Sequence, residues 1–173
     1  MIVKIIGIII LLTSSSLLGF VISNKYKTRV RELKEIRNHF QMIETEIIYT
    51  ATPIIEVMDK ISQQAKEPFK DVYKNIALEL RKKEGESLGS IWRKAFDDKK
   101  NYTRLNKEDL ETIIFFGNVL GTSDRENQLK NSQLIQSQLS KLEEIAEEER
   151  QRSEKLYKNL GALLGLALTI ILI

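Results

Sequence analysis

The sequence has no cysteine, one histidine, two prolines and eight glycines among its 173 residues. Without cysteine it has no disulfide framework, no thiolate metal site, no cysteine nucleophile and no site for lipoprotein-type acylation. The single histidine, His39, excludes catalysis by several histidines and argues against a serine–histidine pair. The scarcity of proline and glycine, with aromatic residues at 7%, favours helices over packed β-sheets.

The sequence also lacks the short motifs that accompany common enzymatic sites. It has no glycine-rich phosphate loop, no Gly-x-Ser-x-Gly elbow and no Asp-x-Asp calcium loop. Because no second histidine and no cysteine accompanies His39, we interpret it as a partly buried or surface residue rather than a ligand. The acidic run at 143–149 is read as a solvated helix face that balances Arg150 and Arg152. We therefore expect no catalytic residue, metal, cofactor or small-molecule substrate, and no enzymatic activity.

Uncharged apolar stretches lie near both ends of the chain. Residues 5–22 and residues 160–173 contain no charged side chain. As a helix the first stretch measures roughly 27 Å, against about 30 Å for the hydrocarbon core of a bilayer. We predict transmembrane helices at 1–23 and 159–173, flanking a domain at 24–158. Two alternatives remain: a cleaved signal peptide for the first stretch, and a helix end buried in protein for the second.

Basic residues border both uncharged stretches on their inner sides. Residues 25–37 carry a net charge of 6 − 2 = +4 and residues 150–158 a net charge of 4 − 1 = +3. With Lys4 these sum to +8, so the total of +3 leaves −5 for residues 38–149. Positive charge beside apolar ends is typical of membrane-proximal segments. A nucleic-acid-binding protein places its positive charge on the folded domain, so we expect no nucleic-acid partner. By the positive-inside tendency, the middle domain is cytoplasmic and both termini face outwards.

Small residues within the two predicted spans are candidates for helix packing. Ser15 and Gly19 are four residues apart in the first stretch, as are Gly161 and Gly165 in the second. This small-xxx-small spacing lets two membrane helices approach each other closely. We therefore expect the spans to pack together or against a partner's helix.

Apolar residues in the middle of the chain recur every three or four positions, which is the spacing of one helix face. The first stripe comprises Val30, Leu33, Ile36, Phe40, Ile43 and Ile47. Five further stripes comprise Ile54, Met58 and Ile61; Phe69, Val72, Ile76 and Leu80; Leu88, Ile91, Trp92, Ala95 and Phe96; Leu110, Ile113, Ile114, Phe116, Val119 and Leu120; and Leu129, Ile135, Leu139, Leu142 and Ala146. The sequence therefore predicts an all-α protein, a bundle of about six helices flanked by the two spans.

Local signals predict where two of these helices begin. Thr52 suits the N-cap of the second helix and Pro53 its first helical position. Ser123 and Glu126 have the spacing of a capping box at the start of the last helix, after Gly121.

Three stretches of the chain resemble the stage III sporulation protein AB family of endospore-forming bacteria. They are Arg31-Glu-Leu-Lys-Glu-Ile-Arg37, Glu44-x-Glu46-Ile-x-Tyr49-x-x-Thr52-Pro53-Ile54, and Phe116-Gly-x-x-Leu-Gly-x-x-Asp124-Arg125-x-x-Gln128. The apolar, Leu- and Gly-rich C-terminal stretch is similar too. The resemblance extends over nearly the whole chain, although residues 82–106 carry little of it. Ile54 stands where family members often have leucine.

This resemblance implies a subunit of a membrane complex that links the mother cell with the developing forespore. It implies a cytoplasmic helical domain similar to that of the type II secretion and type IV pilus platform protein, an F-type helical domain. The implied partners are a hexameric secretion-type ATPase and other channel subunits, in the mother-cell membrane that becomes the outer forespore membrane. Candidate docking residues, taken from the matching motifs, are Glu46, Tyr49, Thr52, Pro53, Asp124, Arg125 and Gln128. The alternative function is a membrane-tethered coiled-coil adaptor or sensor with no role in transport.

Overall fold

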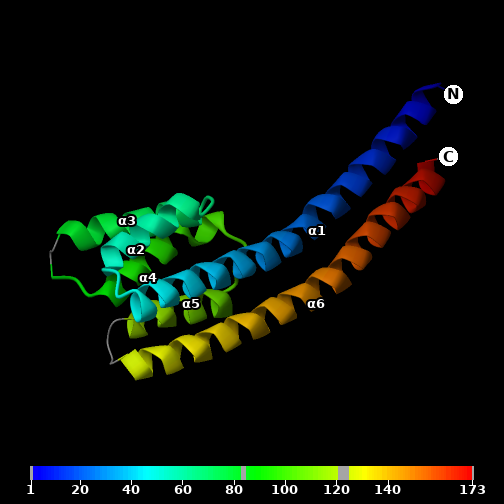
Figure 1. Cartoon of the computed structure of the whole chain (residues 1–173). Helices are drawn as coiled ribbons and strands as arrows, with labels where there is room; N and C mark the ends of the chain where they lie inside the picture. Colours follow the sequence, from blue (N-terminus) through cyan, green and yellow to red (C-terminus); the bar gives the residue numbers. More distant parts are fainter. Residues whose placement is uncertain (1, 83–84, 121–124, 173) are drawn as a thin grey trace. The chain divides into compact units, whose positions relative to one another are not determined.

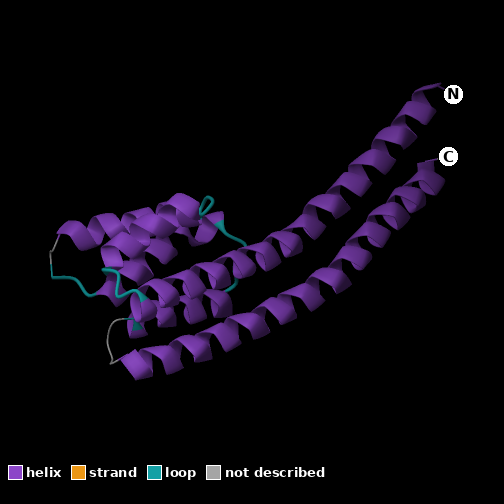
Figure 2. Ribbon diagram, in the orientation of Figure 1, coloured by secondary structure: helices purple, strands orange, loops and turns teal. Residues whose placement is uncertain are grey.

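The structure, a computed structural model of the chain, describes residues 2–82, 85–120 and 125–172. Most side chains of residues 2–19 and 161–172, and those of Arg125 and Lys158, lie outside this description. The described residues form helices joined by loops, with no strand among them (Figure 2). The elements in chain order are α1 (Ile2–Glu44), a π-helical turn (Thr45–Tyr49), α2 (Ile54–Gln64), α3 (Phe69–Lys82), α4 (Leu88–Lys99), a 3-10 turn (Lys100–Tyr102), α5 (Lys107–Val119) and α6 (Arg125–Leu172) (Figure 1). The prediction of an all-α bundle with about six helices is confirmed.

The chain divides into two compact units. Unit 1 comprises Met1–Val30 and Glu144–Ile173, and unit 2 comprises Arg31–Glu143. The divisions fall inside α1 and α6, so each of these helices contributes one segment to each unit. The domain boundaries predicted at residues 23 and 158 stay predictions.

Unit 2 is a helical bundle around an aromatic centre. In it α2 packs on α3, α3 on α4, and α4 on α5. The rings of Phe40 on α1 and Phe116 on α5 stack with centroids 3.9 Å apart, and Trp92 on α4 lies 5.7 Å from Phe116. The indole N–H of Trp92 donates to the carbonyl of Ile113 at 3.0 Å, so the one polar atom of this ring is satisfied inside the core.

The predicted apolar stripes form this core, with one correction on α1. Leu33, Ile36, Phe40 and Ile43 are buried here, and Val30 is buried in unit 1, but Ile47 is only half-buried and Ile48 takes its place. The reason is the π-helical turn at Thr45–Tyr49, whose wider i→i+5 bonding shifts the buried face by one residue. Residues predicted at several helix ends are also only half-buried, namely Ile54, Leu80, Leu88, Leu110, Val119, Leu120 and Leu129. The core includes Val57 and Tyr73, which the stripes did not contain.

Helix starts differ in detail from the prediction. The N-cap of α2 is Pro53, one residue later than predicted, and the Thr52 hydroxyl bonds elsewhere. The predicted capping box at Ser123 lies outside the described residues. A capping box is present on α5 instead: Asn106 Oδ1 accepts from the Asp109 amide at 2.9 Å, and Asp109 Oδ2 accepts from the Asn106 amide at 2.8 Å.

In unit 1, α1 and α6 run antiparallel and are joined by side chains. Arg29 pairs with Glu149 at 2.5 Å and Lys27 with Glu154 at 3.2 Å. The rings of Tyr26 and Tyr157 stack with centroids 6.2 Å apart. The acidic run was predicted to be a solvated face balancing Arg150 and Arg152. Glu147 does pair with Arg150 at 2.6 Å, and Glu149 is half exposed, but the carboxylate of Glu149 pairs with the buried Arg29 of α1 instead of with Arg150 or Arg152.

No helix stretch within the described residues is both long enough and apolar enough to cross a bilayer. The two predicted spans, 1–23 and 159–173, consist mainly of residues whose side chains are not described. The transmembrane helices therefore stay predictions.

Candidate partner-docking site

Residues 45–53, which connect α1 to α2 and are called the turn below, are held in place by Glu46. The Thr52 amide donates to the Glu46 carbonyl at 2.9 Å, and the Thr52 hydroxyl donates to the Glu46 carboxylate at 2.7 Å. Lys60 Nζ on α2 lies 3.0 Å from both carboxylate oxygens. The Thr52 hydroxyl, and then Lys60, hold the pKa of Glu46 below its usual value. The carboxylate is therefore ionised at neutral pH and links the turn to α2.

This turn has a backbone that few residues adopt and carries an exposed aromatic side chain. Ala51 has a φ of +53°, in the left-handed region that costs a residue with a Cβ about 1 kcal/mol or more. Tyr49, which ends the π-helical turn, is 65% exposed. Pro53 is exposed as well, at the N-cap of α2. The hydrogen bonds of Glu46 and the fixed φ of Pro53 restrict the backbone of this turn.

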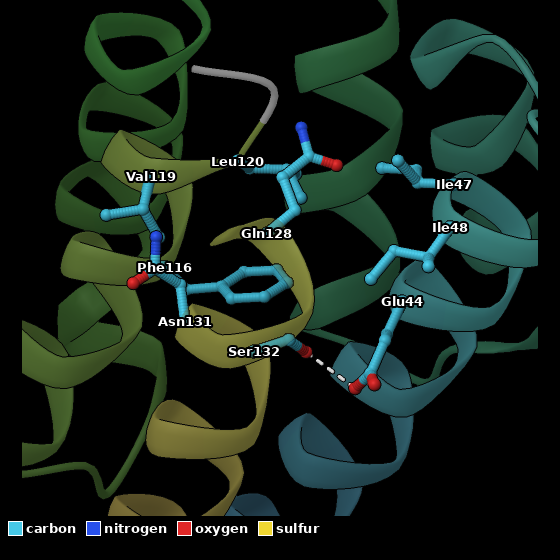
Figure 3. A pocket seen from close by; sticks show the side chains of 9 residues that line it. All are labelled: Glu44, Ile47, Ile48, Phe116, Val119, Leu120, Gln128, Asn131 and Ser132. Atoms are coloured by element: carbon cyan, nitrogen blue, oxygen red, sulfur yellow. Dashed lines mark hydrogen bonds between the residues drawn. The ribbon is translucent and has the colours of Figure 1, made fainter. Parts of the chain in front are cut away.

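Beside the turn lies a small pocket that the end of α1, the π-helical turn, α5 and α6 build together (Figure 3). It is lined by Glu44, Ile47, Ile48, Phe116, Val119, Leu120, Gln128, Asn131 and Ser132. Its volume of about 20 Å³ is room for one water molecule, far less than a cofactor needs. At its edge the Ser132 hydroxyl donates to the Glu44 carboxylate at 2.5 Å, which ties α6 to the end of α1.

Two glutamates of the first matching motif, residues 31–37 on α1, bind loops of unit 2. Glu32 is buried, and its carboxylate accepts from the amide of Arg104 in the α4–α5 loop at 2.7 Å. Glu35 accepts from the amide of Lys66 in the α2–α3 loop at 3.0 Å. Burial raises the pKa of Glu32 above its usual value, although the Arg104 hydrogen bond acts in the opposite direction. This stretch of α1 therefore fixes two loops of the bundle.

His39 is a core residue. It is buried, with its ring edge-on to Tyr73 at 5.2 Å between centroids and to Phe69 at 6.3 Å. Burial lowers the pKa of His39 to about 4 and raises that of Tyr73. Among the described residues, no group of histidine and acidic side chains is arranged to hold a metal ion.

The structure brings some of the predicted docking residues together. Glu46 and Thr52 are hydrogen-bonded, and Tyr49 and Pro53 lie on the same turn. Gln128 lines the pocket with Ile47 and Ile48. Asp124 lies outside the described residues, as do the side chains of Arg125 and Ser15 and the surroundings of Gly19, Gly161 and Gly165. Their proposed roles stay predictions.

Lys60, Glu44 and Ser132 were not among the predicted site residues. Glu44 begins the second motif, and its carboxylate accepts from Ser132. The carboxylate of Glu46 accepts from Thr52 and Lys60. No sequence signal marks the partners, since Ser132 follows Glu44 by 88 residues and Lys60 follows Glu46 by 14.

The sequence model of the stage III sporulation protein AB family matches residues 4–173. The chain belongs to this family. Stage III sporulation protein AB of Bacillus subtilis (strain 168) is 28% identical over 169 residues, which cover 98% of each chain. A solved structure of stage III sporulation protein AB (SpoIIIAB) superposes with a TM-score of 0.68 at 27% identity, covering 72% of this chain and 97% of that one. The resemblance stated from the three motifs is confirmed.

Proposed function

We propose that this member of the sporulation family is a non-enzymatic platform subunit of a membrane complex. In this proposal the uncharged ends anchor the chain in the membrane, unit 2 lies in the cytoplasm, and a secretion-type ATPase binds unit 2. Other subunits of the channel contact the membrane-anchored ends. Membership in the sporulation family and the uncharged ends support the first part, and the docking site supports the second.

The observation that carries the proposal is the meeting of two distant motifs at one place. Residues 44–54 and residues 116–128 both resemble the family, and Glu44, Phe116 and Gln128 line one pocket. Beside it, Tyr49 is exposed on a turn that the Glu46 carboxylate fixes. A backbone turn that is already ordered loses little entropy on binding, and tyrosine is enriched among the residues that dominate interface energies.

The test compares two exposed tyrosines on the full-length chain. Tyr49→Ala removes the aromatic ring of the proposed site, and Tyr102→Ala removes one that is 74% exposed after α4. Binding of the complex's hexameric ATPase should fall about tenfold or more for Tyr49→Ala, the size expected of an interface anchor. It should change little for Tyr102→Ala. Equal binding by both variants and the parent would remove Tyr49 from the interface.

A second candidate, a membrane-tethered adaptor or sensor, is favoured by one feature. Helices α1 and α6 each run without interruption from unit 1 into unit 2, so a movement in one unit could pass along either helix to the other. The same binding experiment separates the two functions. If the parent chain does not bind the ATPase at all, the adaptor becomes the better account.

A further inference from the structure

In the part of unit 1 whose side chains are described, three basic side chains form no ion pair with its carboxylates. Ion pairs join Arg29 to Glu149, Lys27 to Glu154, and Arg150 to both Glu147 and Glu154. Exposed basic side chains without an ion pair in the described part of this unit are Lys25, Arg152 and Lys155. The remaining carboxylates of the unit, Glu144 and Glu148, lie further along α6 from the uncharged end, and Glu148 is one helical turn from Arg152. None of the three cations is held by an ion pair within 4 Å in the described part of the unit.

An aromatic pair marks the same level of the two helices. Lys25 precedes Tyr26 on α1, and Lys155 lies two residues before Tyr157 on α6. The two tyrosine rings stack on each other with an interplanar angle of 21°. Tyrosine is enriched where a membrane helix passes from hydrocarbon into the headgroup region, because its ring is apolar and its hydroxyl is polar. The uncharged stretches 5–22 and 160–173 begin a few residues beyond this pair.

We propose that Lys25, Arg152 and Lys155 bind the phosphates of anionic phospholipid headgroups. The inference rests on the proposed membrane anchoring and goes beyond it, since a span needs no particular headgroup. Arg152 and Lys155 lie between an apolar stretch and an acidic one on α6, and Lys25 lies between an apolar stretch and further basic residues on α1. In the proposed anchoring, the membrane surface is the polyanion that meets both helices at this level. Juxtamembrane lysine and arginine side chains are attracted to anionic lipids in this way.

The experiment measures which lipid lies against this site. The chain has no cysteine, so Asn24→Cys, at an exposed position next to Lys25, gives one labelling site for a bimane fluorophore. The full chain is reconstituted in phosphatidylcholine vesicles that contain the same mole fraction of either brominated phosphatidylglycerol or brominated phosphatidylcholine. Bromine quenches the fluorophore on contact, so the ratio of the two quenching curves gives the relative affinity for the anionic lipid.

We expect about a fivefold preference for phosphatidylglycerol. The triple variant Lys25→Gln, Arg152→Gln and Lys155→Gln should lose it. The matched control carries the same loss of three charges on exposed positions of unit 2, namely Lys70→Gln, Lys74→Gln and Arg93→Gln, and should keep it. The charge-retaining variant Lys25→Arg, Arg152→Lys and Lys155→Arg should also keep it. The emission of Trp92, the one tryptophan of the chain, verifies that each variant is folded.

The possible failures are distinguishable. Equal quenching by both brominated lipids would overturn the inference and leave the membrane anchoring intact. Quenching by neither lipid would overturn the inference and the anchoring together. Loss of the preference in the unit 2 control would show that net charge, not these three residues, attracts the lipid. Loss on adding inorganic phosphate at constant ionic strength would show a general phosphate site instead of a lipid site.

Discussion

Replacing Gly117 with alanine should destabilise unit 2, although alanine is the better helix former. Gly117 is buried on α5 under the indole of Trp92. A Cβ at this position would overlap Cγ and Cδ1 of the indole and lie 2.7 Å from the Cβ of Trp92. The indole has little freedom to move, because Phe40 and Phe96 contact it and its N–H is bonded to Ile113.

One stabilising and two destabilising contributions set the change in the free energy of unfolding. Alanine in place of glycine within a helix gains about 1 kcal/mol. Forcing a methyl group into a filled core costs about 1–3 kcal/mol. If the indole shifts to make room, its buried N–H loses the Ile113 carbonyl, which costs about 1–3 kcal/mol more. The expected net loss is therefore about 3 kcal/mol of unfolding free energy.

The assay is urea denaturation of the full chain in detergent micelles, followed by far-ultraviolet circular dichroism. Gly89→Ala on α4 is the matched control, because its Cβ would meet the side-chain oxygen of the exposed Asn118, which can turn away, and would lie 3.2 Å from the Asn118 Cα, which a shift of a few tenths of an ångström relieves. That variant should lie within about 1 kcal/mol of the parent. A Gly117→Ala chain at least as stable as the parent would refute the reasoning, as would an equal loss in Gly89→Ala.

Two further predictions concern buried ionisable groups. His39 has a pKa of about 4 when folded and about 6.5 when unfolded, so the unfolded chain binds more protons between these values. The contribution of neutral His39 to the free energy of unfolding is therefore fully present above pH 6.5 and decreases as the pH falls. At pH 5 the free energy of unfolding is about 2 kcal/mol lower on this account. Urea denaturation at a series of pH values gives the unfolding free energy of the parent and of His39→Gln, and the difference between the two isolates this loss. If both free energies change equally with pH, the prediction is contradicted. Glu32→Ala should cost about 2 kcal/mol by leaving the Arg104 amide unpaired, whereas Glu32→Gln keeps an oxygen acceptor and should cost less. Equal losses in thermal unfolding of the two Glu32 variants would show that the charge, not the hydrogen bond, matters.

The candidate site was only partly predictable. The motifs identified Glu46, Tyr49, Thr52 and Gln128, and the family comparison confirms the resemblance on which they were chosen. The sequence did not indicate that Gln128 would line one pocket with Ile47 and Ile48, because these residues are about 80 positions apart. Contacts across such distances depend on how helices are arranged, and one sequence contains no record of that arrangement.

The sequence by itself determined the helical class and the core stripes, because the 3.6-residue period is a local property. Four residues of the α1 stripe, from Leu33 to Ile43, are fully buried as their spacing predicts. The tertiary structure alone decided the π-helical shift to Ile48, the burial of Glu32 against a loop amide, and the contact of Gly117 with Trp92. Each of these depends on what a neighbouring element presents at one point in space. Periodicity gives the direction in which a side chain points, but the identity of its partner follows only when the helices are packed.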